Sequence, residues 1–390
     1  MSGALLVTGG TGLLGGQIVA RYLERTDRRV YALVRGADDA EAARRIDEAL
    51  AATYGAGHGY SDRVTAVAGD LKQPGLGVDA ARLDKVAEEV TTVIHAAASI
   101  SFALPLDESR RVNVDGTARA LELAELCERR GGLDGFAHIS TTYVAGAYDG
   151  HFREDDVDVG QEFRNPYELS KLEGEQLVRR EIGKLPVRIF RPGIVVGEEQ
   201  SGWTPAFNVL YFPVKLFSKG VNPPIIPARR DTPLDCVPVD YVADSLFELV
   251  EREGDIGTTF HLVAGERAGT VGEVLDMSAD RFGRRQPKLI PFWLYMRALH
   301  PVVIRAFRGA RRRQMIAATE FFPYFSMRQT FGHERASGLL EPEGLVAPAL
   351  GEYFDRLLAY AAASDWGRRP LARDEARALA EADVPPALAA

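Results

Sequence analysis

The sequence predicts an α/β fold built on a doubly wound parallel sheet, followed by a smaller, interwoven C-terminal substrate-binding region. Short β-branched segments alternate with helical patterns through the first half of the chain, which favours parallel strands joined by right-handed crossovers. The first segment leads directly into a glycine-rich loop, and from about Gly197 the alternation gives way to proline- and aromatic-rich sequence. The expected strands are ALLVTG, RRVYALV, RVTAVAGD, TTVIHAAA, FAHIST, VRIFRPG and, later, FHLVAG.

This pattern divides the chain into three parts. We expect a Rossmann-type nucleotide-binding domain over residues 1–196 and a substrate-binding region over 197–368, with residues 236–265 returning to the first domain's sheet. Thr270–Phe282 has a helical pattern whose first threonine and following glutamate have the spacing of a helix cap. The Ala-rich segment 369–390 is expected to be a weak helix or a flexible tail.

Composition excludes several classes of protein. A chain of 390 residues with 46% hydrophobic and 26% charged residues can bury a large core, and its net charge of -8 argues against a nucleic-acid partner. Cys127 and Cys236 lack paired spacing, so we expect buried thiols in a cytoplasmic protein and no metal site. Prolines and charges interrupt Trp203–Phe217 and Pro291–Phe307, so no integral membrane segment is expected. No basic leader precedes Ala4, so no secretion signal is expected.

The glycine-rich loop predicts a dinucleotide site. A strand, a glycine turn and a helical pattern follow one another, which is the order that places a pyrophosphate at a helix N-terminus. Gly9 permits the tight turn, Gly12 lets the backbone approach the phosphates, and Gly15 allows close packing of helix on strand. The alternative is a structural turn without a ligand. The predicted contacts in this loop are Thr8, Gly9, Gly12, Leu13, Leu14 and Gly15.

The end of the second strand favours NADP(H) over NAD. Arg35 stands near the position where an acidic residue would hold the ribose hydroxyls of NAD, and a guanidinium can pair with the extra phosphate of NADP. Asp38 and Asp39 are interpreted as caps of the following helix rather than ribose ligands. Arg44 or Arg45 could add a second phosphate contact, although a solvated helix face explains both.

Two further strand ends are candidate cofactor contacts. Asp70 and Leu71 follow the third strand, where a carboxylate or backbone group could meet the adenine, although Asp70 is also a typical turn residue. His95, Ala96 and Ala97 close the fourth strand, where small residues leave room for the middle of the cofactor. A satisfied core histidine is the alternative for His95.

The candidate catalytic pair is Tyr167 and Lys171, one turn apart on one face of a predicted helix. A phenol has an ordinary pKa of about 10, and we expect the nearby ammonium to lower the pKa of Tyr167 toward the working range. Lysine can also hold the nicotinamide ribose. Alone, this spacing is common on amphipathic helices, but here it follows a five-strand nucleotide-binding pattern.

Other polar groups are expected beside this pair. The fifth strand ends in Ser140, Thr141 and Thr142, and one of these hydroxyls should donate to the substrate carbonyl. Asn113 could hold a water molecule behind the lysine for proton delivery, or it could be a helix-capping amide.

The motifs together resemble those of the extended short-chain dehydrogenases, and more narrowly the thioester reductase and fatty acyl-CoA reductase branch. The broad resemblance covers about Leu5–Val263. It implies that Thr141 is the catalytic hydroxyl, that Tyr167 donates a proton, and that Lys171 is its partner and a ribose ligand. It also implies that Arg191-Pro192-Gly193 walls the nicotinamide pocket. The motifs are TGGTGLLG, LVRG, AGDLKQPGLG, IHAAASISF, NVDGT, HISTTYVAG, NPYELSKLEGE, RIFRPGIVVG and the following GW.

The function that this resemblance implies is NADPH-dependent reduction of an acyl thioester to an aldehyde and, in a second round, an alcohol. The substrate would be an acyl-CoA or an acyl group on a carrier protein, because the sequence shows no adenylation or carrier segment. Alternatives are a related reaction on a sterol, a ketone or alcohol, or a sugar nucleotide, and a cofactor-sensing protein without catalysis. The oligomeric state is left open.

Two features of the second half bear on the substrate. The aromatic segment Trp203–Ile226 and the later PFWLYMRALHPVVIRAF could form an apolar channel for an acyl chain, or could only close the core of this region. A basic cluster could contact coenzyme A phosphates, an acidic carrier protein or anionic lipid headgroups, or could be a solvated helix face. Its members are Arg305, Arg308, Arg311, Arg312 and Arg313.

Overall fold

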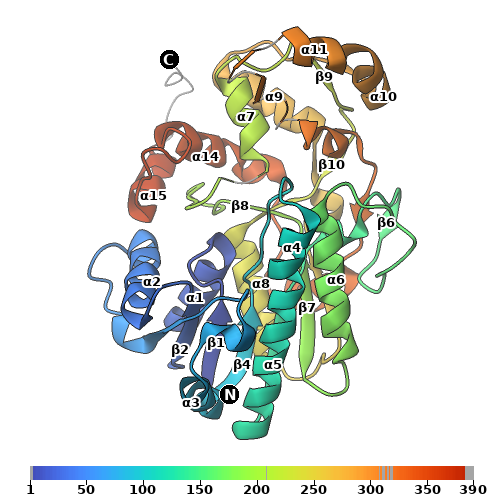
Figure 1. Ribbon diagram of the computed structural model, residues 1–390. Coiled ribbons are helices and arrows are strands. Elements are labelled where there is room, and N and C mark those ends of the chain that lie inside the picture. The colour runs from blue at the N-terminus through green and yellow to red at the C-terminus, as the bar shows by residue number, and fades with distance from the viewer. Residues whose placement is uncertain are drawn as a thin grey trace.

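The computed structural model contains the predicted doubly wound parallel sheet (Figure 1). It describes residues 3–207, 209–306, 308, 309, 312, 313, 316 and 319–382. The seven strands lie in the order β12-β7-β5-β4-β1-β2-β3, and every adjacent pair is parallel. They are β1 (Ala4–Thr8), β2 (Val30–Val34), β3 (Val64–Ala68), β4 (Val90–His95), β5 (Gly135–Ile139), β7 (Val187–Pro192) and β12 (Thr259–Leu262).

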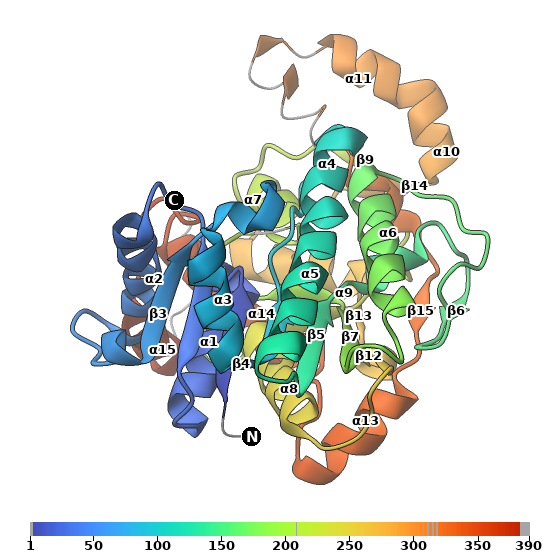
Figure 2. The same cartoon turned by 60° about the horizontal axis from the view of Figure 1, so that its bottom comes forward.

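Alternate side chains of each strand enter different cores. Leu5 and Val7 of β1 pack with α1 and α8 on one face of the sheet, whereas Ala4 and Leu6 pack with α3, α5 and α6 on the other (Figure 2). Both faces are covered, so most strand residues are apolar and all seven strands have buried residues. The helices are α1 (Leu13–Arg25), α2 (Asp39–Tyr54), α3 (Ala80–Glu89), α4 (Leu106–Asn113), α5 (Asp115–Arg130), α6 (Pro166–Arg180) and α8 (Val239–Glu251).

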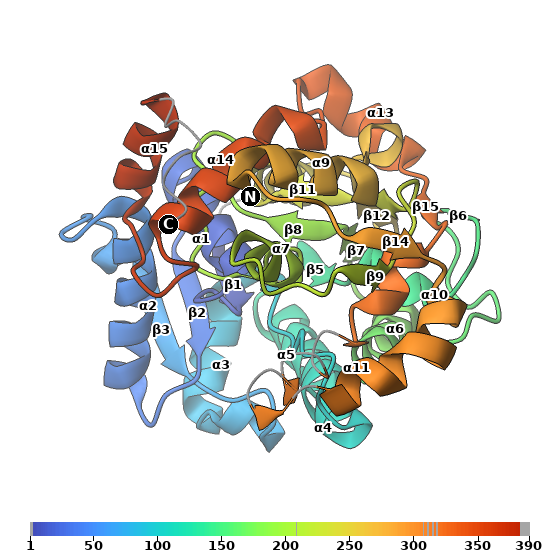
Figure 3. The same cartoon turned by 90° about the horizontal axis from the view of Figure 1, so that it is seen from above.

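The second half of the chain forms a layer beyond the carboxyl edge of the sheet (Figures 1 and 3). Its helices are α7 (Tyr211–Ser218), α9 (Val271–Phe282), α10 (Phe292–Leu294), α11 (His300–Ala306), α13 (Glu334–Leu340) and α14 (Leu350–Ala363). Two-stranded pairs join β8 (Ile194–Val196) to β11 (Cys236–Pro238), β9 (Ile225–Pro227) to β14 (Lys288–Ile290), β10 (Pro233–Leu234) to β13 (Gly269–Thr270), and β6 (His151–Phe152) to β15 (Thr330–Phe331).

Short helical turns complete the secondary structure. They are η1 (Ser61–Arg63), η2 (Pro74–Gly77), η3 (Thr142–Ala145), η4 (Gly265–Arg267), the π turn η5 (Tyr295–Leu299), η6 (Phe322–Ser326) and η7 (Glu341–Glu343). At the start of α9, Thr270 accepts from the Glu273 amide and Glu273 returns a bond to the Thr270 amide, which is the expected capping box.

The segment expected to be a tail contains a docked helix, α15 (Arg373–Glu381). It packs against α14 and α2, and Ala376 is fully buried. Arg373 forms an ion pair of 2.6 Å with the buried carboxylate of Glu198. Contacts with sequence-distant elements therefore hold this helix, and the Ala-rich composition does not reveal them.

The cysteines and the apolar helices bear on two expectations drawn from composition. Cys127 and Cys236 are free and buried, as expected. Within the part of the chain that the structure describes, we find no helix long and apolar enough to cross a membrane.

Candidate active site

The glycine loop leaves no room for side chains at its critical positions. Gly9 has a φ of +79°, and a Cβ there would lie 2.8 Å from the Ala97 amide nitrogen. A Cβ on Gly15 would collide with the carbonyl oxygen of Gly9. Gly12 precedes the first residue of α1 without a side-chain cap, so the helix N-terminus faces the loop. This is a backbone cradle of the kind that binds a pyrophosphate.

A cleft of about 470 Å³ lies over this loop. Four strand ends and the loops that follow them line the cleft. The predicted residues among its lining are Thr8, Gly9 and Gly12 after β1, Arg35 after β2, Asp70 and Leu71 after β3, and Ala96 and Ala97 after β4. These predicted residues are therefore brought together. Leu14 instead packs against the core behind the loop. Sequence reasoning did not single out Thr11, Leu33, Gly69, Lys72, Ser99 and Leu104, which also line the cleft.

The β2 end of the cleft is cationic. Arg35 is exposed there, and Arg45 lines the same cleft while its Nη1 donates to the Arg35 carbonyl oxygen at 2.6 Å. Asp38 accepts from the Glu41 amide at 2.8 Å as the cap of α2, and Asp39 accepts from the Ala68 amide at 2.8 Å. Both carboxylates are thus engaged with backbone amides, and this end of the cleft suits an anion.

His95 lies beneath the loop and does not line the cleft. Its Nδ1 is 2.8 Å from the Thr8 hydroxyl and its Nε2 is 3.1 Å from the Thr117 hydroxyl. Burial lowers the pKa of His95 to about 3, so the ring is neutral. The Thr8 hydroxyl also accepts from the Ala97 amide at 3.2 Å. His95 therefore supports the loop from inside, as the core-histidine alternative supposes.

Tyr167 and Thr141 form the hydroxyl pair of the site. Asn165 caps α6 by accepting from the Glu168 amide at 3.1 Å, and Pro166 begins the helix, which places Tyr167 in its first turn. Burial raises the pKa of Tyr167 to about 12, and the neighbouring Thr141 hydroxyl opposes this rise. Tyr167 is therefore a neutral phenol at neutral pH.

Lys171 lies one turn further along α6 and points at the end of β5. Its Nζ donates to the Ile139 carbonyl oxygen at 2.7 Å. Burial lowers the pKa of Lys171 to about 8, whereas the negative charge of Glu175 raises it. We expected the ammonium to lower the pKa of the Tyr167 phenol, but in the structure burial raises that pKa, and the ammonium donates to a backbone carbonyl.

The two neighbouring hydroxyls face elsewhere. Ser140 donates to Glu175 at 2.7 Å, and Thr142 donates to the Pro192 carbonyl at 3.4 Å. Of the three hydroxyls at the end of β5, Thr141 is the one paired with Tyr167. The geometry thus separates residues that the sequence leaves equivalent.

Asn113 connects the loop after β4 to α6. Its Oδ1 accepts from the Ser99 amide at 2.8 Å, and its Nδ2 donates to the Ser99 carbonyl and the Ser170 hydroxyl, each at 3.0 Å. Asn113 is the last residue of α4 and does not cap α5. Asn113 therefore connects the loop after β4, which lines the cleft, to the helix that contains Tyr167.

A buried ion pair joins α6 to β7. Arg191 and Glu175 have no exposed side-chain surface and are joined by bonds of 2.9 and 2.6 Å. Arg191 therefore does not wall a pocket. Gly193 follows β7, and the position requires glycine because a Cβ there would lie 2.6 Å from the Asp235 carbonyl oxygen. Sequence reasoning missed Glu175, although its place four residues after Lys171 puts both on one helix face.

A family comparison now identifies the chain. A family model described as "Male sterility protein" matches residues 7–246. The chain belongs to this family. It is an NAD(P)-dependent oxidoreductase of the extended short-chain dehydrogenase type, in the thioester reductase and fatty acyl-CoA reductase branch.

The relatives of this reductase include much larger proteins. A nonribosomal peptide synthetase of Aspergillus flavus is 32% identical over 278 residues, which cover 67% of this chain and 26% of the relative. A carboxylic acid reductase of Segniliparus rugosus is 30% identical over 63% of this chain and 23% of its own. The chain thus spans about a quarter of the length of these relatives.

Solved structures agree with the family. The terminal R domain of the myxalamid PKS-NRPS biosynthetic pathway has a TM-score of 0.79 and 25% identity, with 95% of this chain and 93% of that chain covered. A UDP-glucuronic acid 4-epimerase of Bacillus cereus has a TM-score of 0.62 at 18% identity, and this likeness shows the fold alone.

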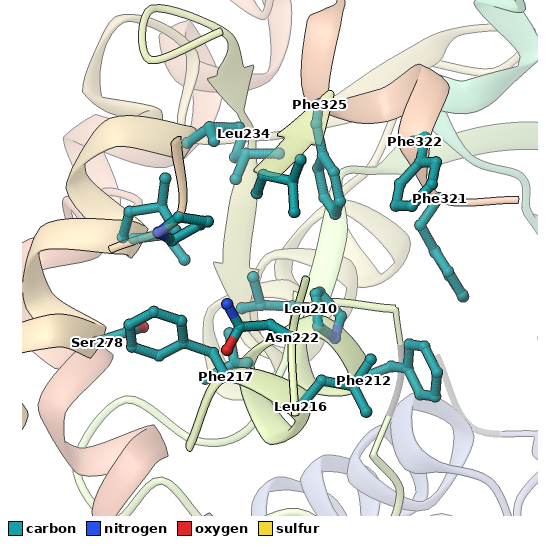
Figure 4. Close-up of a pocket in the computed structure, with 17 residues that line it drawn as sticks. Leu210, Phe212, Leu216, Phe217, Asn222, Leu234, Ser278, Phe321, Phe322 and Phe325 are labelled. Carbon is teal, nitrogen blue, oxygen red and sulfur yellow. The ribbon is translucent and has the colours of Figure 1, made fainter. Parts of the chain in front are cut away.

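The layer that the second half of the chain forms contains an apolar cavity of about 100 Å³ (Figure 4). Leu234 and Phe325 approach it from one side and Leu216 and Phe217 from the other. A series of ring contacts connects it to Tyr167. The ring centroids are 5.6 Å apart for Tyr167 and Phe102, 5.7 Å for Phe102 and Phe321, and 5.5 Å for Phe321 and Phe212.

Proposed function

We propose that this reductase converts an acyl thioester to an aldehyde with NADPH as the reductant. The observation that carries the proposal is the grouping of Thr141, Tyr167 and Lys171 at the carboxyl edge of the sheet, where Thr141 follows β5 and Lys171 lies one turn after Tyr167 on α6. Acyl reduction is the chemistry named in its relatives, which include a carboxylic acid reductase and a fatty acyl-CoA reductase of Drosophila melanogaster.

Each polar group has a role in this reaction. Thr141 and Tyr167 donate hydrogen bonds to the thioester carbonyl oxygen and stabilise the negative charge that develops on it. Because Tyr167 is a neutral phenol, it can give its proton to that oxygen. Lys171 holds a positive charge beside the phenol and can bind the nicotinamide ribose. Asn113 positions α6. Reduction of the thioester gives a hemithioacetal, whose collapse releases a thiol and leaves the aldehyde.

The cleft fits a dinucleotide, and its cationic end supports NADP(H). When bound, NADPH supplies a hydride to the carbonyl carbon. The loop of Gly9 and Gly12 would hold the pyrophosphate by its amides, and Arg35 with Arg45 would bind the 2′-phosphate. Asp38 and Asp39 accept from backbone amides, and neither is among the residues that line the cleft.

The apolar cavity supports an acyl substrate rather than a sugar nucleotide. Apart from Asn222 and Ser278, the side chains around it are apolar, and a sugar bearing several hydroxyls would lose hydrogen bonds there. We assign substrate binding to residues 197–368 and place the end of the acyl chain in this cavity. The acyl group would arrive on coenzyme A or on a carrier protein, and a second round would give the alcohol.

The test is to follow NADPH absorbance against a panel of acyl-CoA, carrier-bound acyl, aldehyde, sterol and sugar-nucleotide substrates, with products identified by mass spectrometry. We expect NADPH consumption with acyl thioesters and an aldehyde or alcohol product. Tyr167→Phe should lower kcat by at least about 100-fold, since general acid catalysis typically contributes that much. Turnover of a sugar nucleotide without thioester reduction, or full activity of the Phe variant, would refute the proposal.

A further inference from the structure

One segment of the substrate layer has a charge opposite to that of the whole protein. Between Asp280 and Glu320 the chain has ten lysines and arginines and no aspartate or glutamate, whereas the net charge of the protein is -8. Among the described residues of the segment, Arg297, Arg305, Arg308, Arg312 and Arg313 are all exposed. Arg311 lies outside the described residues. None of these five exposed arginines forms an ion pair with a described carboxylate.

A helical stretch inside this segment has two different faces. It consists of α10, η5 and α11 and runs from Phe292 to Ala306. Its inner face packs on the substrate layer, where Tyr295 is fully buried and lies 5.4 Å from the ring of Phe322. Figure 2 shows α10 and α11 projecting from the body of the molecule. The outer face of this stretch is therefore a convex ridge.

The outer face of the ridge combines apolar and cationic side chains. Trp293 is 67% exposed, Leu294 38% and Val302 61%, and the exposed Arg297 and Arg305 lie on the same face at helical spacing. The other two tryptophans of the chain, Trp203 and Trp366, are only 3% and 8% exposed. A merely solvated helix would carry charges of both signs and few large apolar groups.

We propose that this ridge docks on an anionic lipid surface. Trp293, Leu294 and Val302 would enter the boundary between headgroups and acyl chains, and Arg297 with Arg305 would pair with lipid phosphates. A stretch of 15 residues is about 22 Å long, which is enough to lie in the interface and too short to span it. A lipid surface accounts for the projecting tryptophan, which an acidic protein would have to receive in a pocket of its own.

The location links the ridge to the cavity. Tyr295, Phe322 and Phe212 form one apolar cluster, and Phe322 and Phe212 also line the cavity. The outer side of the helix would thus touch lipid while its inner side covers the cavity. Supply of an apolar acyl group from the membrane rests on the proposed function, but lipid binding itself does not.

The test uses vesicles of phosphatidylglycerol and phosphatidylcholine, with pure phosphatidylcholine vesicles for comparison. Because Trp293 is the exposed tryptophan, its emission should shift to the blue on binding. We expect flotation with the anionic vesicles only, and loss of binding at 0.5 M salt, where the Debye length is roughly five times shorter than at 0.02 M. Arg297→Glu with Arg305→Glu should weaken partition by at least about 25-fold, since each cation near an anionic surface is worth about a factor of five.

A matched control reverses the same number of charges elsewhere. Arg129 and Arg180 lie in the last turns of α5 and α6, at the other end of the molecule from α11 in Figure 1. Arg129→Glu with Arg180→Glu should bind vesicles as the parent does, and so should Tyr167→Phe, which separates lipid binding from catalysis. Trp293→Ala should lose the emission shift and most of the binding.

Three results would overturn the proposal. The first is absence of binding to anionic vesicles at low salt by folded parent protein. The second is equal loss of binding in the Arg297/Arg305 pair variant and the Arg129/Arg180 pair variant, because binding would then follow net charge alone. The third is capture of a purified acidic acyl carrier protein through Trp293 and Arg297 when no vesicle binds. Circular dichroism and thermal melting of each variant establish that it is folded.

Discussion

Replacing Glu175 by glutamine tests the buried network behind the catalytic helix. Glu175 accepts bonds from Arg191 at 2.6 and 2.9 Å, from Arg179 at 2.8 Å and from Ser140 at 2.7 Å. Glutamine keeps the volume but removes the charge, so Arg191 is left buried without compensation. Loss of one partner of a buried pair costs roughly 3–5 kcal/mol, against a total stability of roughly 5–15 kcal/mol. We therefore expect a markedly lower midpoint of urea unfolding at pH 7.

The pH dependence of this effect has a defined sign. The two arginines hold the pKa of Glu175 below its ordinary value, so the charge stabilises the folded state above the unfolded pKa of about 4.3 and this contribution is lost as the pH falls. The difference in the free energy of unfolding between the parent protein and the Glu175→Gln variant should therefore become smaller as the pH is lowered. Glu175 also raises the pKa of Lys171, which is about 8. Without it, the alkaline limit of kcat/KM should move to lower pH.

A control lies on the same helix. Glu173 pairs with Arg110 at the surface, where such pairs are worth about 0–1 kcal/mol, so Glu173→Gln should change neither readout appreciably. A free energy of unfolding of Glu175→Gln within about 1 kcal/mol of the parent's would refute the role of the buried ion pair in stability. An unchanged alkaline limit of kcat/KM would refute the effect of Glu175 on the pKa of Lys171.

The remaining predictions concern the cofactor and the cavity. Arg35→Ala with Arg45→Ala should raise KM for NADPH relative to NADH by roughly tenfold or more, since each charged bond contributes about 1.5–3 kcal/mol, and an unchanged ratio would refute the NADP assignment. Gly15→Val should abolish NADPH binding in a fluorescence titration because its side chain meets the Gly9 carbonyl; undiminished affinity would contradict the cradle. Val274→Phe should fill the cavity and lower kcat/KM roughly tenfold for long-chain acyl thioesters but not for an acetyl thioester. An equal decrease for both substrates would refute the placement of the acyl chain in this cavity.

The parts of the molecule that the sequence predicted are those with local signals. The strands of the main sheet follow from short β-branched runs, and the glycine loop follows from a strand, a turn and a helix in order. The cap of α9 was readable because Thr270 and Glu273 are three residues apart. Tyr167 and Lys171 were likewise readable because helical spacing alone places them on one face.

The parts that it did not predict depend on contacts between distant segments. Phe102 and Phe321 meet beside the catalytic tyrosine although more than 200 residues separate them. The docking of α15 involves Glu198, which lies in the loop after β8. The direction of the Lys171 ammonium depends on a carbonyl at the end of β5, so the expected effect on the phenol's pKa could not be judged without coordinates.

One face of α6 contacts three consecutive residues at the end of β5. Lys171 bonds to Ile139, Glu175 bonds to Ser140, and Tyr167 neighbours Thr141. The three helix residues are spaced by one turn each, so a slip of the helix along the strand would break all three contacts together. The ion pair of Glu175 with the fully buried Arg191 of β7 opposes such a slip. The same buried charge that stabilises the fold therefore sets the position of the Tyr167 hydroxyl relative to Thr141, which is why Glu175→Gln should alter catalysis as well as stability.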